Sequence, residues 1–107
     1  MAVNIFKNVT ANLTTSGDAL YTSPLGYTGI ILLAQISNLT ANTISASVFV
    51  QTDSSLTSLA TGFQIPANDA GVVIGGKLVL EAGQQLFASA SANSAAQITL
   101  SILESQN

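Results

Sequence analysis

The stretch Gln97-Ile-Thr-Leu-Ser-Ile102 alternates polar and aliphatic side chains, residue by residue. Because successive side chains of a β-strand point to opposite faces, this alternation predicts a strand with one buried face. The stretch 44–51 repeats the pattern, with apolar side chains on one face at Ile44, Ala46, Val48 and Val50. Good helix formers such as Glu, Lys and Arg are rare, and no long stripe of period 3.6 occurs. The chain is therefore predicted to be all-β.

Turn-forming residues divide the chain into about eight short segments of strand character. The predicted strands cover residues 4–15, 19–22, 29–37, 44–51, 58–65, 71–80, 84–91 and 96–104. Short strands at this spacing are typical of a β-sandwich or barrel. We predict a two-sheet antiparallel β-sandwich, and both a jelly-roll and an immunoglobulin-like topology are open.

Four segments carry further expectations. Residues 30–36 are apolar on both faces, which predicts a central strand with one face in the core and the other on a neighbouring subunit. The segment 53–60 is ambiguous, and its start Ser54-Ser55-Leu56 is expected to form a loop or a single helical turn. Gly75-Gly76 is expected to interrupt strand 71–80 with a bulge or kink. Small side chains are expected to point inward at Ala88, Ala90 and Ala92.

A length of 107 residues fits one domain. Within it, residues 1–17 are expected to form an N-terminal arm and first strand, a candidate docking segment, and residues 18–107 the body of the sandwich. The N-terminus lacks the charged region and apolar core of a signal peptide, and the longest apolar run is too short for a membrane helix. We therefore expect a soluble chain made in the cytoplasm.

The composition removes most of the raw material for catalysis. The chain has two basic and five acidic residues and no Cys, His or Trp. Nucleophilic catalysis needs an activated Ser or Cys and a base, and no base of this kind is present. The acids lie in or beside turns or at the chain end, where solvated side chains are expected: Asp18, Asp53, Asp69, Glu81 and Glu104. A calcium ion at Asp69 is an alternative to a simple turn. We predict no enzymatic activity, no cofactor and no metal.

Two further interpretations concern partners and modification. A net charge of −3 with two basic residues predicts no nucleic-acid binding, because a phosphate track needs many cations. Asn-X-Thr sequons occur at Asn8, Asn12 and Asn38, and about two are expected by chance in a chain so rich in Asn, Ser and Thr. Without a signal peptide, we interpret them as chance.

The aromatic side chains are few and unevenly placed. Phe49 and Phe87 each fall on the face opposite their strand's aliphatic side chains. Two interpretations are open: packing in a second layer of the sandwich, or a subunit interface, where aromatics are enriched. Tyr21 and Tyr27 flank Pro24, and each is expected to anchor a loop through its hydroxyl, with contact to carbohydrate or a partner as the alternative.

Across about residues 18–104 the chain resembles a known group of proteins. The matching elements are Leu20-Tyr-Thr-Ser-Pro24, Ile65-Pro66-Ala67, Gly75-Gly-Lys-Leu-Val-Leu-Glu-Ala-Gly83 and Ile98-Thr-Leu-Ser-Ile-Leu-Glu104. They resemble the small all-β virion structural proteins of tailed bacteriophages, which include capsid decoration (cement) proteins and neck or tail accessory proteins. The most specific part is Leu78–Gly83, where a strand pair meets a tight glycine turn, and residues 1–17 are matched least.

The resemblance implies a virion protein made in the host bacterial cytoplasm. It points to a capsid decoration protein that binds the major capsid protein or other virion proteins, bridges capsomers and resists internal DNA pressure, commonly as a homotrimer. The alternatives are a neck or tail accessory protein of the fibre base, or a carbohydrate-binding β-sandwich module. In such proteins a variable terminus can dock, which implies a docking role for residues 1–7.

The low charge suits a lattice protein. Burying an unpaired charge at a contact costs several kcal/mol, whereas Ser, Thr and Asn are easily hydrogen-bonded. The remaining charges Lys7, Lys77 and Glu81 are expected to orient the subunit. Charged edge strands usually prevent aggregation, so we expect the sheet edges to be closed or captured in an oligomer. The candidate interface residues are Phe6, Lys7, Phe49, Phe87, Lys77 and Glu81.

Overall fold

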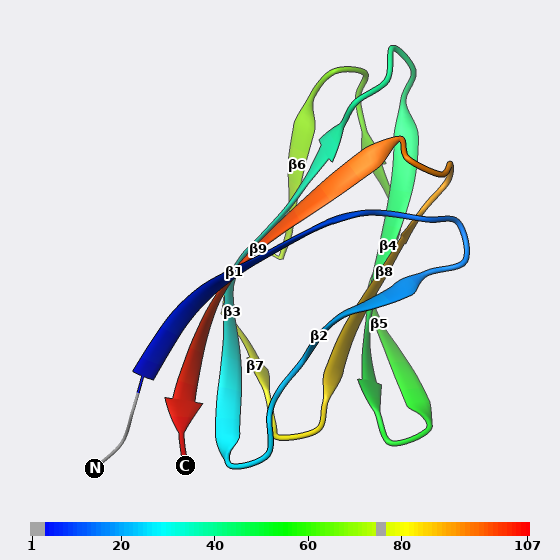
Figure 1. Ribbon diagram of the computed structural model, residues 1–107. Coiled ribbons are helices and arrows are strands. Elements are labelled where there is room, and N and C mark those ends of the chain that lie inside the picture. The colour runs from blue at the N-terminus through cyan, green and yellow to red at the C-terminus, as the bar shows by residue number, and fades with distance from the viewer. Residues whose placement is uncertain (1–3, 75–76) are drawn as a thin grey trace.

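The computed structural model describes residues 4–74 and 77–107, and within them the chain forms two antiparallel sheets that face each other (Figure 1). The strands are β1 (Asn4–Asn12), β2 (Asp18–Thr22), β3 (Tyr27–Asn38), β4 (Ile44–Thr52), β5 (Ser55–Ile65), β6 (Ala70–Ile74), β7 (Leu78–Leu80), β8 (Gln85–Ala90) and β9 (Ala96–Gln106). Sheet A has the order β1-β9-β3-β6, with β7 also paired to β3, and sheet B has the order β2-β8-β4-β5. The predicted antiparallel β-sandwich is confirmed.

The strand pairing is nested from the ends of the chain to its middle. Strand β1 pairs with β9, β2 with β8, β3 with β6 and β7, and β4 with β5. The chain thus behaves as one long hairpin whose paired strands are rolled into two facing sheets, which is the jelly-roll arrangement. In an immunoglobulin-like sandwich, with strands lettered A to G along the chain, the two sheets have the orders ABED and CFG. The orders found here differ from these, so of the two topologies that the sequence left open the structure has the jelly roll.

The core lies between the sheets and follows the predicted alternation. In β9, Ile98, Leu100 and Ile102 are buried, whereas Gln97 and Thr99 are exposed. In β4 the same alternation buries Ile44, Ala46, Val48 and Val50. Each fully buried aliphatic side chain stabilises the fold by roughly 1.5–3 kcal/mol relative to exposure. On β8 the inward side chains are Ala88 and Ala90, but Ala92 is exposed because the strand ends at Ala90.

One local expectation is wrong in part. The segment 53–60 forms no helical turn, and its turn is limited to Asp53 and Ser54 because β5 begins at Ser55. Asp53 takes a left-handed backbone conformation, with φ of 53°, in the tight turn that joins β4 to β5. The residues after it then pair with β4, because a sheet edge offers their backbone groups hydrogen bonds that an isolated turn lacks. The segment 71–80 forms two strands, β6 and β7, so the described residues hold nine strands. The expected kink at Gly75-Gly76 lies outside the described residues.

The side-chain amide of Asn38, which is 3% exposed, links the end of β3 to the segments that follow β3 and β5. Its Nδ2 donates to the backbone oxygens of Asn42, Ile65 and Pro66 at 2.7, 3.0 and 3.1 Å. Its Oδ1 accepts from the backbone N and the Oγ1 of Thr40 at 2.9 and 2.8 Å. The side chain is therefore structural, and the sequon at Asn38 is inaccessible in the folded protein.

The N-terminal segment is part of the sandwich. Residues 4–12 form β1 at the edge of sheet A and pair along their whole length with β9. Of the segment 1–7 for which docking is expected, residues 1–3 lie outside the described residues, and residues 4–7 belong to β1. A docking role for these residues and the division of the chain at residue 17 remain predictions.

Candidate functional site

The outer face of sheet A carries a row of apolar side chains that crosses four strands. Phe6 on β1 lies opposite Leu103 on β9, Leu103 lies opposite Ile30 on β3, and Ile30 lies opposite Val79 on β7. We call these four residues the apolar row. Phe6 is 74% exposed and Val79 is 55% exposed, whereas Leu103 and Ile30 between them are half-buried. The row is thus an apolar band that no element of the described chain covers.

A hollow of about 230 Å³ borders the apolar row at Phe6. It is lined by residues of β1, β9 and β3, among them Asn8, Ser101 and Leu32. The pairing of β3 with β9 shifts between Ile31 and Leu33, so Leu32 is the extra residue of a bulge. Leu32 is one of the exposed apolar residues. This bulge enlarges the apolar surface beside Phe6. The packing of the outer face of residues 30–36 on a neighbouring subunit remains a prediction.

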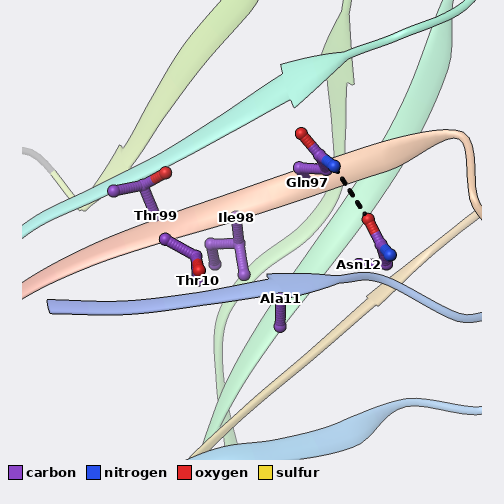
Figure 2. A pocket seen from close by; sticks show the side chains of 6 residues that line it. All are labelled: Thr10, Ala11, Asn12, Gln97, Ile98 and Thr99. Atoms are coloured by element: carbon purple, nitrogen blue, oxygen red, sulfur yellow. Dashed lines mark hydrogen bonds between the residues drawn. The ribbon is translucent and has the colours of Figure 1, made fainter.

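Farther along the same two strands the outer face becomes polar. A groove of about 400 Å³ lies over β1 and β9. Figure 2 shows the side chains that line it: Thr10, Ala11, Asn12, Gln97, Ile98 and Thr99. Gln97 Nε2 donates to Asn12 Oδ1 at 3.0 Å, and Thr10 lies opposite Thr99 in register. These hydroxyls and amides can exchange hydrogen bonds with a partner without the desolvation penalty of a charge.

The outer face of sheet B carries the two phenylalanines that the sequence placed outward. Phe49 on β4 lies opposite Phe87 on β8, and both are half-buried. Phe87 is also opposite Ala19 on β2, and Phe49 is opposite Ser58 on β5. The alternation therefore predicted their face correctly, and the fold joins them in one cross-strand aromatic pair. Such pairs stabilise a sheet by roughly 0.2–1 kcal/mol, so part of their role is internal.

The structure separates the remaining candidates. Lys77 and Glu81 are exposed residues that precede and follow β7. Among residues 4–74 and 77–107, the ion pair that forms is Lys7 with Glu104, with 3.3 Å between Lys7 Nζ and Glu104 Oε2. Lys7 lies opposite the buried Ile102, so its side chain starts on the inner face of sheet A, whereas its neighbour Phe6 points outward. The orienting role expected for Lys7, Lys77 and Glu81 remains a prediction.

Glu104 is part of a buried polar link between the two sheets that the sequence analysis missed. It is 3% exposed, and its Oε2 accepts a hydrogen bond from the Tyr21 hydroxyl at 2.6 Å. Burial and this bond raise the pKa of Tyr21 well above its usual range. The expectation of a solvated Glu104 is wrong because Tyr21 and Lys7 supply the partners that a buried carboxylate requires. The signal was present: position 104 continues the inward series Ile98, Leu100, Ile102.

Glycine at position 29 makes room for this link. Gly29 lies opposite Glu104 in the β3–β9 ladder. A Cβ at Gly29 would lie 2.8 Å from Tyr21 Oη and 2.9 Å from its Cε2, which is closer than real contacts allow. Tyr21 is 7% exposed, so it cannot present its ring to carbohydrate. Its hydroxyl joins β2 to β9 and does not anchor a loop, which corrects both expectations for this residue.

The remaining acidic residues do not cluster into a metal-binding site among the described residues. In the part of the chain that the structure describes, no three residues of the His, Cys, Asp and Glu types gather to hold a metal. Asp69 Oδ1 accepts a hydrogen bond from the backbone N of Ala70 at 2.8 Å, and Asn68 before it has a φ of 56°, so this segment is a tight turn. The described residues also contain no helix long and apolar enough to cross a membrane.

Comparison with known proteins supports the fold. No protein-family model and no curated protein matches the sequence. A chain of the T13 particle of IBDV, an icosahedral virus, has a TM-score of 0.54 and 7% identity over 95% of this chain and 30% of that chain. A chain of the Bacillus endospore appendages, which form disulfide-linked pili, has a TM-score of 0.50 and 4% identity over 99% of this chain and 88% of that chain. The chain thus spans about 30% of the viral chain. These likenesses show a shared all-β sandwich.

Proposed function

We propose that this chain is a non-enzymatic structural protein of a virus particle, and that it binds the particle through the outer face of sheet A. The observation that carries the proposal is the apolar row, which exposes Phe6 and Val79 on a chain with two basic and five acidic residues. Contiguous apolar patches on a protein surface mark interaction sites. The likeness to chains of a viral particle and of a pilus supports a structural role over a catalytic one.

Within the virion, the proposed role is that of a capsid decoration protein, with the major capsid protein as partner. Each subunit would contribute a small contact made of the apolar row and the polar groove next to it. Many copies bound to the repeating capsid lattice would then hold neighbouring capsid subunits together. Multivalency strengthens this binding without any new type of contact. No cofactor, metal or nucleic acid takes part in this proposal. A homotrimer remains the expected state of the free protein, and its mass in solution tests that expectation.

The copy number in purified particles tests the location. Hundreds of copies per particle are expected for a capsid decoration protein. A neck or tail accessory protein is the second candidate, and closed cyclic symmetry there leads to about six to eighteen copies. Quantitative mass spectrometry of particles purified from lysed bacterial hosts distinguishes the two. Absence of the chain from purified particles would contradict a virion role of either kind.

A pair of substitutions tests the surface. Phe6→Ser combined with Val79→Ser removes the two exposed ends of the apolar row and leaves the core intact. Burial of each side chain contributes roughly 1.5–3 kcal/mol, so rebinding to particles stripped of the protein should weaken at least about tenfold. Leu56→Ser is the matched control, because Leu56 is 59% exposed on β5 of the other sheet. Equal rebinding of the double variant and the control would contradict the assignment of sheet A.

A further inference from the structure

The edges of the two sheets differ in how well they are protected against pairing with another strand. The edge strands of sheet B are β2 and β5. Strand β2 has only five residues and a register shift in its pairing with β8, and the pairing of β5 with β4 has two register shifts. In sheet A, β6 has five residues next to a shift and β7 has three. Strand β1 has nine residues that pair with β9 without a shift. Short or bulged edges resist pairing, so β1 is the edge best able to accept a strand.

The hydrogen bonds of β1 leave one full side of its backbone open. Leu13, next to the strand, donates its N–H to the Ala96 oxygen at 2.9 Å. In a regular antiparallel ladder, bonded pairs alternate, so the odd-numbered residues 5–11 also direct their backbone groups toward β9. The even-numbered residues from Asn4 to Asn12 then direct theirs away from the sheet. Within residues 4–74 and 77–107, β9 is the strand that pairs with β1.

Building on the structural role proposed above, we propose that β1 of one copy pairs antiparallel with β1 of a second copy, centred on Asn8. This register uses all nine residues of the strand and brings even-numbered residues opposite even-numbered ones, as the open backbone groups require. It joins the two copies of sheet A into one continuous sheet, β6-β3-β9-β1-β1-β9-β3-β6. The sole charge on β1, Lys7, is already engaged by Glu104 of its own chain.

The side chains favour the same register. Centred on Asn8, the pairing puts Phe6 opposite Thr10 of the other copy on the outer face, and Ile5 opposite Ala11 on the inner face. Ile5 points inward from β1 yet is 38% exposed, so the added strand covers it. A register centred on Lys7 would place the two lysines opposite each other, which destabilises a strand pair. Centred on Asn8, each Lys7 faces Val9.

Cysteine crosslinking tests the contact directly, because the chain contains no cysteine of its own. Asn8→Cys places two thiols on the two-fold axis, with Cα atoms about 5.5 Å apart, which is within the span of a disulfide. Thr10→Cys is the matched control: it lies on the same strand and face, but its Cα atoms would be about 14 Å apart in this register. We expect Asn8→Cys to form a dimer on a denaturing gel at least tenfold faster than Thr10→Cys. Equal rates, or no dimer from either variant, would overturn the pairing.

A second pair of variants measures the role of the open backbone. Asn8→Pro removes the edge N–H of Asn8 but no hydrogen bond to β9, whereas Asn8→Ala keeps that N–H. The central pair loses two hydrogen bonds, so sedimentation should show the Kd of the association through β1 rise about tenfold to a hundredfold for Asn8→Pro. Asn8→Ala should stay within about threefold of the wild type, and circular dichroism checks that both variants fold. Equal Kd values for the two folded variants would overturn the proposal, and if Asn8→Pro fails to fold, the crosslinking result decides.

The two proposals fail differently. A chain that is present in purified particles but does not crosslink through Asn8→Cys refutes pairing through β1 and leaves the virion role standing. A chain that crosslinks as expected but is absent from particles refutes the virion role alone. The pairing is compatible with a homotrimer, because two trimers joined through one β1 pair contain the same contact. The crosslinked dimer band on a denaturing gel therefore reports the β1–β1 contact whether the protein assembles as a dimer or as joined trimers.

Discussion

Replacing Tyr21 by Phe removes one oxygen atom and tests whether the buried link between the sheets stabilises the fold. The ring stays in place, so little apolar burial is lost. The 2.6 Å bond to Glu104 has the length of a charge-assisted O–H···O⁻ hydrogen bond. Such bonds contribute about 1.5–3 kcal/mol, and the remaining carboxylate is 3% exposed with Lys7 as its other partner. We therefore expect Tyr21→Phe to lower the free energy of unfolding by about 2–3 kcal/mol.

Urea and thermal unfolding followed by circular dichroism measure this loss. For a domain of this size, about 2–3 kcal/mol corresponds to a fall in Tm of roughly 8–12 °C. Tyr27→Phe is the matched control, because Tyr27 is half-buried and no hydrogen bond of its hydroxyl is present among the described residues. It should stay within about 0.5 kcal/mol of the wild type. A Tyr21→Phe protein as stable as the control would refute the reasoning.

The same substitution in a Glu104→Gln background isolates the part played by the charge. The neutral amide oxygen of this background would still accept a hydrogen bond from Tyr21, but a neutral bond contributes only about 0.5–1.5 kcal/mol. The cost of Tyr21→Phe should therefore fall to about half in this background. An unchanged cost would show that the negative charge of Glu104 has no part in the link.

Three further outcomes are expected. Above pH 10 the wild type should lose about 1.4 kcal/mol of stability per pH unit relative to Tyr21→Phe, because the folded protein retains the Tyr21 proton, with its pKa raised, that the unfolded chain releases near pH 10. Urea unfolding from pH 9 to 11.5 measures this, and parallel curves for the two proteins would contradict it. Gly29→Ala should destabilise by about 1–3 kcal/mol through its contact with the Tyr21 ring, and less when combined with Tyr21→Phe, as a double-mutant cycle in urea shows. Asn38→Ala should cost about 2–4 kcal/mol, because it leaves buried carbonyl groups unpaired; a loss under about 1 kcal/mol would mean that water replaces the amide.

The sequence predicts well what depends on local alternation. The inward positions of β4 and β9 and the outward position of Phe49 follow from a period of two, which needs no knowledge of partner strands. The turn residues place most strand limits within a few residues. The start of β5 at Ser55 was missed because Ser54-Ser55-Leu56 is compatible with a loop, a helical turn or an edge strand, and only pairing with β4 decides among them.

What the sequence does not predict depends on which strands become neighbours. The apolar row exists because β1, β9, β3 and β7 lie side by side, and Phe6 and Val79 are far apart in the chain. The choice between jelly roll and immunoglobulin-like sandwich depends on the same long-range pairing. The link of Tyr21 to Glu104 joins residues 83 positions apart. The chain end and the charge of Glu104 both indicated a solvated side chain, and only its partners reverse that expectation.

The place of β9 between β1 and β3 also constrains how the protein is made. Until residues 96–106 have left the ribosome, β1 has no strand to pair with, and β3 can pair only with β6 and β7, so sheet A stays incomplete. The nested pairing of first with last strands makes most contacts distant in sequence, which places folding on the scale of milliseconds to seconds. During synthesis the apolar inner face of β1 therefore remains unpaired, and ribosome-bound chains that end before residue 96 should be cleaved by protease within residues 4–12.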